Sequence, residues 1–169
     1  MRLSLPVVLC VAVLPLAFLQ PLHAQSSDQV RQIIQADYNQ IDSDEMRGDA
    51  FAGLKYRADG CIEYDRQGHP VKTDLAKLKL QINSETPDQK ELLRNVKVTN
   101  AQTTIESFSL KGTTANVLIQ SYRKVTVYIP SLKRTITNSG SKDGNNISQD
   151  IWRLTGNTWL MISHKSITR

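Results

Sequence analysis

Four side chains of this sequence have the chemistry and the surroundings to handle a proton: Tyr38, Asp65, Asp150 and His164. Asp150 precedes Trp152 by two residues, so both share one face of an apolar strand. A carboxyl group in such company has to be exposed, hydrogen-bonded or functional. His164 follows the apolar run 159–162 and can serve as a base or a ligand contact if it faces inward. Rim exposure or a satisfied core position is the alternative for His164.

Tyr38 and Asp65 also have two interpretations each. Tyr38 lies on an apolar helical stripe, so its hydroxyl points either into the core, as a satisfied core tyrosine, or into a cavity. Asp65 begins the stretch Asp65-Arg66-Gln67-Gly68, in which Asp commonly bonds its own backbone and starts a tight turn. Asp65 can therefore be an acid–base group or a turn residue.

Metal and cofactor chemistry finds no support in the residue pattern. No second histidine or cysteine lies at metal-ligand spacing from His164, and His69 stands alone in a turn. No phosphate-binding glycine loop and no convincing Ser–His–Asp order is present. We therefore predict no metal and no cofactor. The apolar context of Cys61 favours a small buried residue over a nucleophile.

Residues 1–24 have the pattern of a secretory signal peptide. Arg2 precedes an apolar run from Leu3 to Leu19, and Ala24 precedes a polar stretch. A membrane anchor is the alternative, which Pro15 and the weakly charged flanks disfavour. We predict cleavage after Ala24, a single domain over residues 25–169, no later membrane span, and a periplasmic or secreted location. Cys61 would then be the sole cysteine, so no internal disulfide could form.

The charge balance is mildly basic, with a formal net charge of +5. Basic residues gather in one region: Arg123, Lys124, Lys133, Arg134 and Lys142. Nucleic-acid binding needs a readout motif beside such a patch, and none is found. We therefore predict no nucleic-acid partner and interpret the region as a solvated basic face with weak attraction to anionic surfaces.

Hydrophobic periodicity predicts three helices in the first half of the chain. The first begins near Gln29 after a Ser27 or Asp28 cap and ends around 42–45. The second covers Arg47 to Arg57, and Thr73 or Asp74 caps the third. A turn at 58–60 leads to a short strand at 61–64.

Period-two alternation then predicts strands from Leu92 onward, including 104–110 and 115–129. A loop follows at 138–146, and a hairpin closes the chain with its turn at 155–158. Helices followed by a long antiparallel sheet indicate an α+β domain. A sheet that curls around the helices forms a cone with an open mouth.

In their order and spacing these residues resemble the NTF2-like superfamily, in particular its SnoaL-like and DUF4440-type branches. The resemblance covers nearly the whole of residues 25–169. It is carried by the helical Tyr38, by Arg57-Ala58-Asp59-Gly60, by the stretch from Tyr64 to Gly68, and by Asp150-x-Trp152 with Gly156-x-x-Trp159. The resemblance implies a cone of about three N-terminal helices packed on a strongly curved, mainly antiparallel sheet, often paired into a homodimer through that sheet.

The superfamily includes ketosteroid isomerases, which share this cone. By similarity to them, Asp65 takes the position of the base and Asp150 that of the acid that supports an oxyanion, with Tyr38 beside it. Asp65 would remove a proton from a carbon next to a carbonyl. Apolar surroundings would have to keep Asp150 neutral and able to donate. Under the alternative, Asp65 starts a turn and Asp150 accepts hydrogen bonds from its neighbours.

Two further functions stay open at this point, so the sequence does not decide whether the protein is an enzyme. A binding module would hold a small apolar or aromatic molecule without transforming it. Its cone would be lined by aromatic side chains and a histidine: Tyr38, Phe51, Tyr56, Trp152, Trp159 and His164. An assembly subunit would instead use a semi-polar sheet face that includes Ser121, Thr126 and Tyr128.

Overall fold

The computed structural model describes residues 25–49, 51–65, 67–84, 86, 94–139 and 146–167. The predicted signal peptide, residues 1–24, lies outside the described residues. Within them, no helix is long and apolar enough to cross a membrane. The elements, in chain order, are α1 (Ser27–Met46), η1 (Ala52–Tyr56), β1 (Arg57–Tyr64), β2 (Pro70–Lys72), α2 (Leu75–Asn83), β3 (Val96–Lys111), β4 (Thr114–Ile129), η2 (Pro130–Leu132), β5 (Arg134–Ser139), β6 (Ile147–Thr155) and β7 (Thr158–Ile167).

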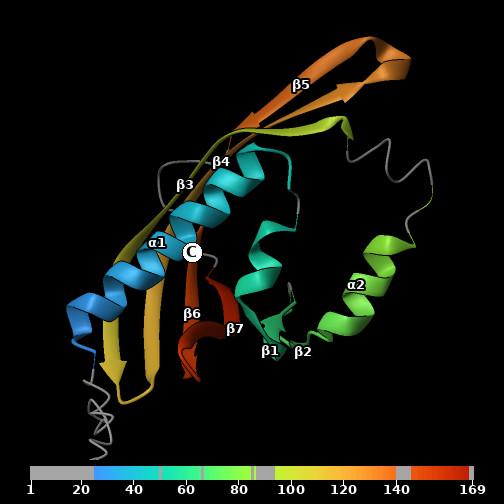
Figure 1. Ribbon diagram of the computed structural model, residues 1–169. Coiled ribbons are helices and arrows are strands. Elements are labelled where there is room, and N and C mark those ends of the chain that lie inside the picture. The colour runs from blue at the N-terminus through green and yellow to red at the C-terminus, as the bar shows by residue number, and fades with distance from the viewer. Residues whose placement is uncertain are drawn as a thin grey trace, which may run out of the picture.

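One curved sheet organises the domain, with α1 lying across it (Figure 1). The strand order is β2-β1-β7-β6-β4-β3, and β5 pairs with the far end of β4. All pairs are antiparallel except β1 with β7, which is parallel. The α+β class and the mainly antiparallel sheet are therefore confirmed. The parallel pair places Glu63 of β1 beside His164 of β7.

The first helix follows the predicted stripe closely. The cap is Ser26 rather than the predicted Ser27 or Asp28. The Gln29 backbone N–H donates to the Ser26 hydroxyl, and the Ser26 backbone N–H donates to the Gln29 side-chain oxygen, which completes a capping box. Val30, Ile34 and Tyr38 are buried against the core cluster, which also contains both tryptophans. The helix continues through the predicted end at residues 42–45, to Met46.

The prediction of a second helix over Arg47–Arg57 is wrong. Gly48 takes a left-handed φ of 96° directly after α1, so the chain turns there instead of continuing a helix. Only a short 3₁₀ segment forms, at Ala52–Tyr56, and Arg57 already begins β1. The described residues thus contain two α-helices rather than three. The turn expected at 58–60 is absorbed into β1, where the register with β7 shifts between Arg57 and Ile62.

The helix expected after Thr73 or Asp74 is present as α2, and the Asp74 carboxylate accepts from the Lys77 backbone as predicted. Leu75 and Leu78 are half-buried, but Leu80 is 69% exposed. In Figure 1, α2 lies beyond β2, away from α1 and the long strands. This helix therefore contributes little to the core.

The closing hairpin is confirmed in register and turn. Strands β6 and β7 pair from Ile147 opposite Ile167 to Thr155 opposite Thr158, with Gly156 at a φ of 61° in the turn. Within the region expected as a loop at 138–146, residues 138 and 139 belong to β5. Residues 140–145 lie outside the described part of the chain.

Candidate functional site: a buried tyrosine–aspartate–histidine network

A continuous hydrogen-bonded network crosses the core from α1 to β7. The Tyr38 hydroxyl donates to Oδ2 of Asp150 at 2.5 Å, and Nε1 of Trp152 donates to the Tyr38 oxygen at 2.9 Å. The second carboxylate oxygen, Oδ1, lies 2.7 Å from Nδ1 of His164. Asp150 itself is fully buried, at 0% exposure. Each carboxylate oxygen thus has its own partner, which a buried charge requires.

The fold places these side chains by simple register. Asp150 and His164 stand directly opposite each other on the antiparallel pair β6–β7, where facing side chains are in contact range. Trp152 follows Asp150 by two residues on the same face. Tyr38 reaches them from the buried stripe of α1, with its ring meeting that of Trp152 edge to face at 5.4 Å between centroids. Tyr38, predicted from its position on that stripe, meets Asp150 as a direct partner.

Electrostatics shifts the pKa of two members of the network, Tyr38 and His164. Burial raises the pKa of Tyr38 well above its ordinary value, and the neighbouring Asp150 charge raises it further, so the hydroxyl stays protonated and donates. The hydrogen bond to Asp150 raises the pKa of His164 above 6.5, against the opposing effects of burial and of Arg57. The protonated imidazolium is therefore favoured, with Nδ1–H donated to Asp150.

A cavity of about 540 Å³ opens against this network. Tyr38, Asp150 and His164 line it, and apolar wall is supplied by Ile41, Ile119 and Met161. His164 keeps 31% of its side chain exposed, which makes it the accessible end of the network. Among the described residues no hydrogen bond engages its Nε2 atom. That nitrogen is the atom through which the network can meet a bound molecule.

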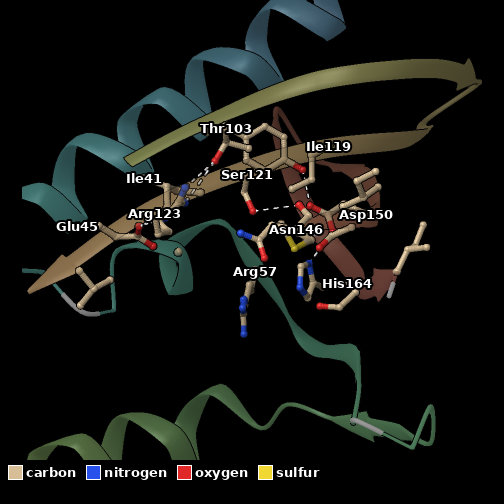
Figure 2. A pocket seen from close by; sticks show the side chains of 18 of the residues that line it. Ile41, Glu45, Arg57, Thr103, Ile119, Ser121, Arg123, Asn146, Asp150 and His164 are labelled. Atoms are coloured by element: carbon tan, nitrogen blue, oxygen red, sulfur yellow. Dashed lines mark hydrogen bonds and ion pairs between the residues drawn. The ribbon is translucent and has the colours of Figure 1, made fainter. Parts of the chain in front are cut away.

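Two arginines add positive charge to the cavity lining (Figure 2). Arg57 lies near His164 and is ion-paired with Glu63. Arg123 lies toward the opposite end, 2.6 Å from Glu45 and 2.8 Å from Asp42. The cavity therefore has charged groups at both ends and apolar side chains between them.

Asp65 lies elsewhere. Its Oδ1 atom accepts from the backbone nitrogens of Gln67 and His69, at 2.9 and 2.8 Å, in the turn that the sequence offered as the alternative. These hydrogen bonds hold the pKa of Asp65 below its ordinary value, and the one from the His69 backbone has the largest effect. Asp65 is not among the described residues that line the cavity around Asp150; it borders a separate depression beside Lys165. The structure brings Tyr38, Asp150 and His164 together and leaves Asp65 outside that group.

The aromatic residues expected to line the cone belong mainly to the core. Trp152 is fully buried, and Trp159 is buried with its Nε1 donating to Gln25 at 2.9 Å. Phe51 and Tyr56 are half-buried, and Tyr56 packs against the core cluster. None of these four borders the cavity formed by the described residues. Tyr38 is the aromatic side chain that does.

Two features of the cavity lining differ from what the sequence predicts. Arg57 was placed at a helix end, and strand pairing with β7 is what brings it to His164. Arg123 was interpreted as part of a solvated face, yet it pairs with the buried Asp42. A signal for this pair was available, because Asp42 continues the four-residue spacing of Ile34 and Tyr38 on α1.

The described residues include no cluster of His, Cys, Asp and Glu suited to a metal ion. Cys61 is a free, buried cysteine, and burial raises its pKa to about 11, so it remains a thiol at neutral pH. The polar side chains that line the cavity include its histidine, tyrosine, carboxylates and arginines.

Comparison with known proteins supports the fold. No protein-family model and no curated protein matches the chain. Among solved structures, it is similar to a conserved protein from Planctomyces limnophilus, with 13% identity, a TM-score of 0.57, and coverage of 86% of this chain and 98% of the other. An NTF2-like superfamily protein from Salmonella enterica has 9% identity and a TM-score of 0.52, with coverage of 85% and 93%.

A third structure is an NTF2-like protein of unknown function in nutrient uptake from Rhodospirillum rubrum, with 15% identity, a TM-score of 0.50, and coverage of 80% of this chain and 98% of the other. The three structures share an architecture with this chain at very low identity, so the likeness concerns the fold and not the activity. The fold expected from the sequence is thereby confirmed: the chain has the NTF2-like fold.

Proposed function

We propose that this domain binds a small organic molecule in its cone, with an oxygen of that molecule hydrogen-bonded to Nε2 of His164. The observation that carries the proposal is the orientation of His164. Its Nδ1 is held by a fully buried carboxylate, and its other face borders the cavity. Because pairing with Asp150 favours the imidazolium, the group offered to the ligand is an N–H donor with positive charge.

The cavity favours a ligand that is partly apolar and carries an anionic or carbonyl oxygen. Its volume, about 540 Å³, falls within the range of small-molecule sites. Ile41, Ile119 and Met161 can cover an apolar or aromatic body. His164 and Arg57 can then meet the oxygen end, since both are cationic and border the same cavity. An aromatic carboxylate has this combination of properties.

A titration with benzoate tests the binding proposal. Benzamide has the same ring without the charge and serves as the matched ligand. We expect benzoate to shift the ring resonances of His164 in a saturable manner and benzamide to do so much more weakly. The variants are followed by the backbone amide resonances of other cavity residues such as Ile119 and Met161. His164→Gln should abolish their response to benzoate, while Asp65→Asn should leave it intact. Binding of both ligands that is unaffected by His164→Gln would refute a role for this histidine.

Proton transfer is a second candidate, favoured by the same network. An imidazolium fixed by a carboxylate can give its Nε2 proton to a carbonyl oxygen of the substrate. The neutral ring can then remove a proton from the neighbouring α-carbon, which leaves the enol and restores the imidazolium. In this mechanism His164 is the acid–base group, Asp150 orients it, and Tyr38 holds Asp150. This arrangement differs from the one implied by the isomerase resemblance, in which Asp65 is the base.

Hydrogen–deuterium exchange at the α-carbon of a ketone separates catalysis from binding. With phenylacetone in D₂O, an enzyme of this kind accelerates deuterium incorporation, and both His164→Gln and Asp150→Asn reduce the rate to that of buffer. Asp65→Asn is the control, because Asp65 does not border the cavity. Benzoate binding without accelerated exchange would identify a binding module, and loss of exchange in Asp65→Asn alone would restore Asp65 as the base.

We propose further that the domain acts after export, with residues 1–24 removed. The support is the apolar run 3–19 that precedes Ala24 in the sequence. Expression of the full chain in a bacterium, followed by intact-mass measurement of the periplasmic fraction, checks this directly. The expected species begins at Gln25, and a chain that retains its first 24 residues in the cytoplasm would contradict the proposal.

A further inference from the structure

One part of the sheet projects beyond the helix that covers the rest. We name it the arm and define it as residues 94–100 and 124–139, which comprise the first part of β3, the last part of β4, η2 and β5. Figure 1 shows the arm extending past the end of α1. Every residue of β5 is exposed, although the strand pairs regularly with β4. The arm is thus folded as sheet but has little cover from the remainder of the domain.

The arm is entirely basic in its charge. No Asp or Glu occurs in residues 94–104 or 121–139. Five exposed cations lie on the arm: Arg94, Lys97, Lys124, Lys133 and Arg134. Among the described residues no carboxylate is ion-paired with any of them, whereas the adjacent Arg123 is held by Asp42 and Glu45. Their charge is therefore available to an external partner.

The same arm exposes large apolar side chains. Val96, Tyr128, Leu132 and Ile136 account for half of the eight exposed large hydrophobic residues in the described part of the chain. Leu132 is the most exposed of the four, at 65%. On an ordinary solvent-exposed surface, hydrophobic residues are scattered singly. The arm differs because several exposed apolar residues and cations lie on the same small segment.

The tip of the arm has a defined shape. Pro130 restricts the backbone at the start of η2, and Lys133 adopts a left-handed φ of 47° as the chain reverses into β5. The Lys133 backbone nitrogen donates to the Pro130 oxygen at 3.1 Å, which closes the turn. Leu132 is presented on this turn, immediately before Lys133 and Arg134. The tip of the arm thus presents an apolar side chain followed directly by two long cationic side chains.

We propose that the tip of the arm binds the surface of a membrane that contains anionic lipid. Leu132 enters the boundary between headgroups and acyl chains at the tip, while Ile136 and Tyr128 flank it on opposite faces of the β4–β5 pair. The cations stay at the level of the phosphates. Long basic side chains and tyrosine are suited to this boundary because each has an apolar body and a polar end. Attraction to anionic headgroups supplies the rest of the affinity.

Two other occupants fit less well. A nucleic acid would engage the cations but would leave the apolar side chains without a partner, and the arm carries no readout motif. A second copy of this chain seated arm to arm would bring two acid-free, basic surfaces together, which costs electrostatic energy. Charge complementarity together with exposed apolar surface therefore favours an anionic lipid surface.

Tryptophan substitution at the tip provides a direct reporter in the full chain. Leu132→Trp places the reporter on the arm, and Leu80→Trp places it on α2 at a nearly equal exposure of 69%. The native Trp152 and Trp159 are buried and form a common background. Vesicles contain either phosphatidylcholine alone or equal parts of phosphatidylcholine and phosphatidylglycerol, each with and without bromine-labelled acyl chains as quenchers. Both variants are expressed and processed in the same way, so residues 1–24, whether retained or removed, affect them equally.

We expect the Leu132→Trp emission to shift to the blue and to be quenched by brominated acyl chains on phosphatidylglycerol vesicles. The Leu80→Trp emission should not change. Adding Lys133→Gln and Arg134→Gln should weaken the affinity for phosphatidylglycerol vesicles about 30-fold, since each basic residue near an anionic surface raises the affinity about fivefold. The response should also fall in high salt.

Five results would overturn the proposal. Three concern the vesicles: no response at the tip, equal quenching of Leu80→Trp, and equal response on vesicles of phosphatidylcholine alone. A fourth is a blue shift that grows with protein concentration in the absence of vesicles. This fourth result would assign the arm to self-association. The fifth, a shift of Leu132→Trp with heparin as large as that with anionic vesicles, would assign it to polyanions instead.

Discussion

Removing a single oxygen atom, in Tyr38→Phe, gives the clearest test of the buried network. The substitution keeps the aromatic ring, so the edge-to-face contact with Trp152 and the packing of α1 are retained. It removes the hydroxyl that donates to Asp150 and accepts from Trp152. The effect on stability is therefore that of the polar contacts alone.

The magnitude follows from these two hydrogen bonds. A hydrogen bond to a charged group contributes about 1.5–3 kcal/mol to stability, and a buried donor left without a partner costs about 1–3 kcal/mol. The two contributions overlap, because the same oxygen serves both partners and the site can relax. We expect a loss of about 3 kcal/mol in the free energy of unfolding, a large share of the roughly 5–15 kcal/mol that a domain has.

Urea denaturation at pH 7, followed by tryptophan fluorescence, measures this loss. The matched control is Tyr128→Phe, which removes the same atom from an exposed side chain and should change the free energy by less than about 0.5 kcal/mol. A double-mutant cycle with Asp150→Asn should give a coupling energy of at least about 1 kcal/mol. A loss in Tyr38→Phe no larger than in the control, with an unchanged dependence on urea, would show that the network contributes nothing to stability.

Three further outcomes are expected. Asp150→Asn should lower the pKa of His164, because burial and Arg57 then oppose protonation without the carboxylate; an NMR titration checks this, with Asp65→Asn as the control that leaves His164 unchanged. The stabilisation from the raised pKa of His164 should be complete below about pH 6.5 and lost as pH rises through the higher folded-state pKa, a slope that His164→Gln should abolish in denaturation curves. Arg123→Met should cost about 3–5 kcal/mol, because it leaves the buried Asp42 without its cation; thermal unfolding that matches the wild type would show that the pair is dispensable.

Local sequence signals predicted those elements whose stability is local. The stripe Val30–Ile34–Tyr38 is contained in one helix, so periodicity is sufficient to predict it. The cap itself is Ser26 and not Ser27 or Asp28 as predicted. The closing hairpin was predicted for the same reason, since Gly156 supplies the turn and the flanking runs pair directly. The second helix failed because helix propensity around residues 47–57 was outweighed by Gly48 and by pairing of β1 with a strand about 100 residues away.

The site was predicted only in part, for a related reason. The apolar surroundings of Asp150 indicated a carboxyl group that needed partners, and the side-chain pattern offered Tyr38 as a candidate. What the sequence could not provide is which acid faces which cavity. The turn chemistry of Asp65 is local and was available as an alternative, whereas the contact between Asp150 and His164 depends on the register of β6 with β7.

The free-energy cost of burying the Asp150 carboxylate indicates a functional reason for the network. A buried carboxylate is often replaceable by an apolar group of similar volume without loss of stability, so packing alone does not require Asp150. The domain instead provides partners from α1 and β7, two distant segments, and leaves both oxygens satisfied. Of these partners, Tyr38 is buried and stays neutral, while His164, whose pKa is raised by the hydrogen bond to Asp150, reaches the cavity. The buried charge therefore acts at the cavity wall through the protonation and orientation of His164, as expected of a site that binds or protonates a ligand oxygen.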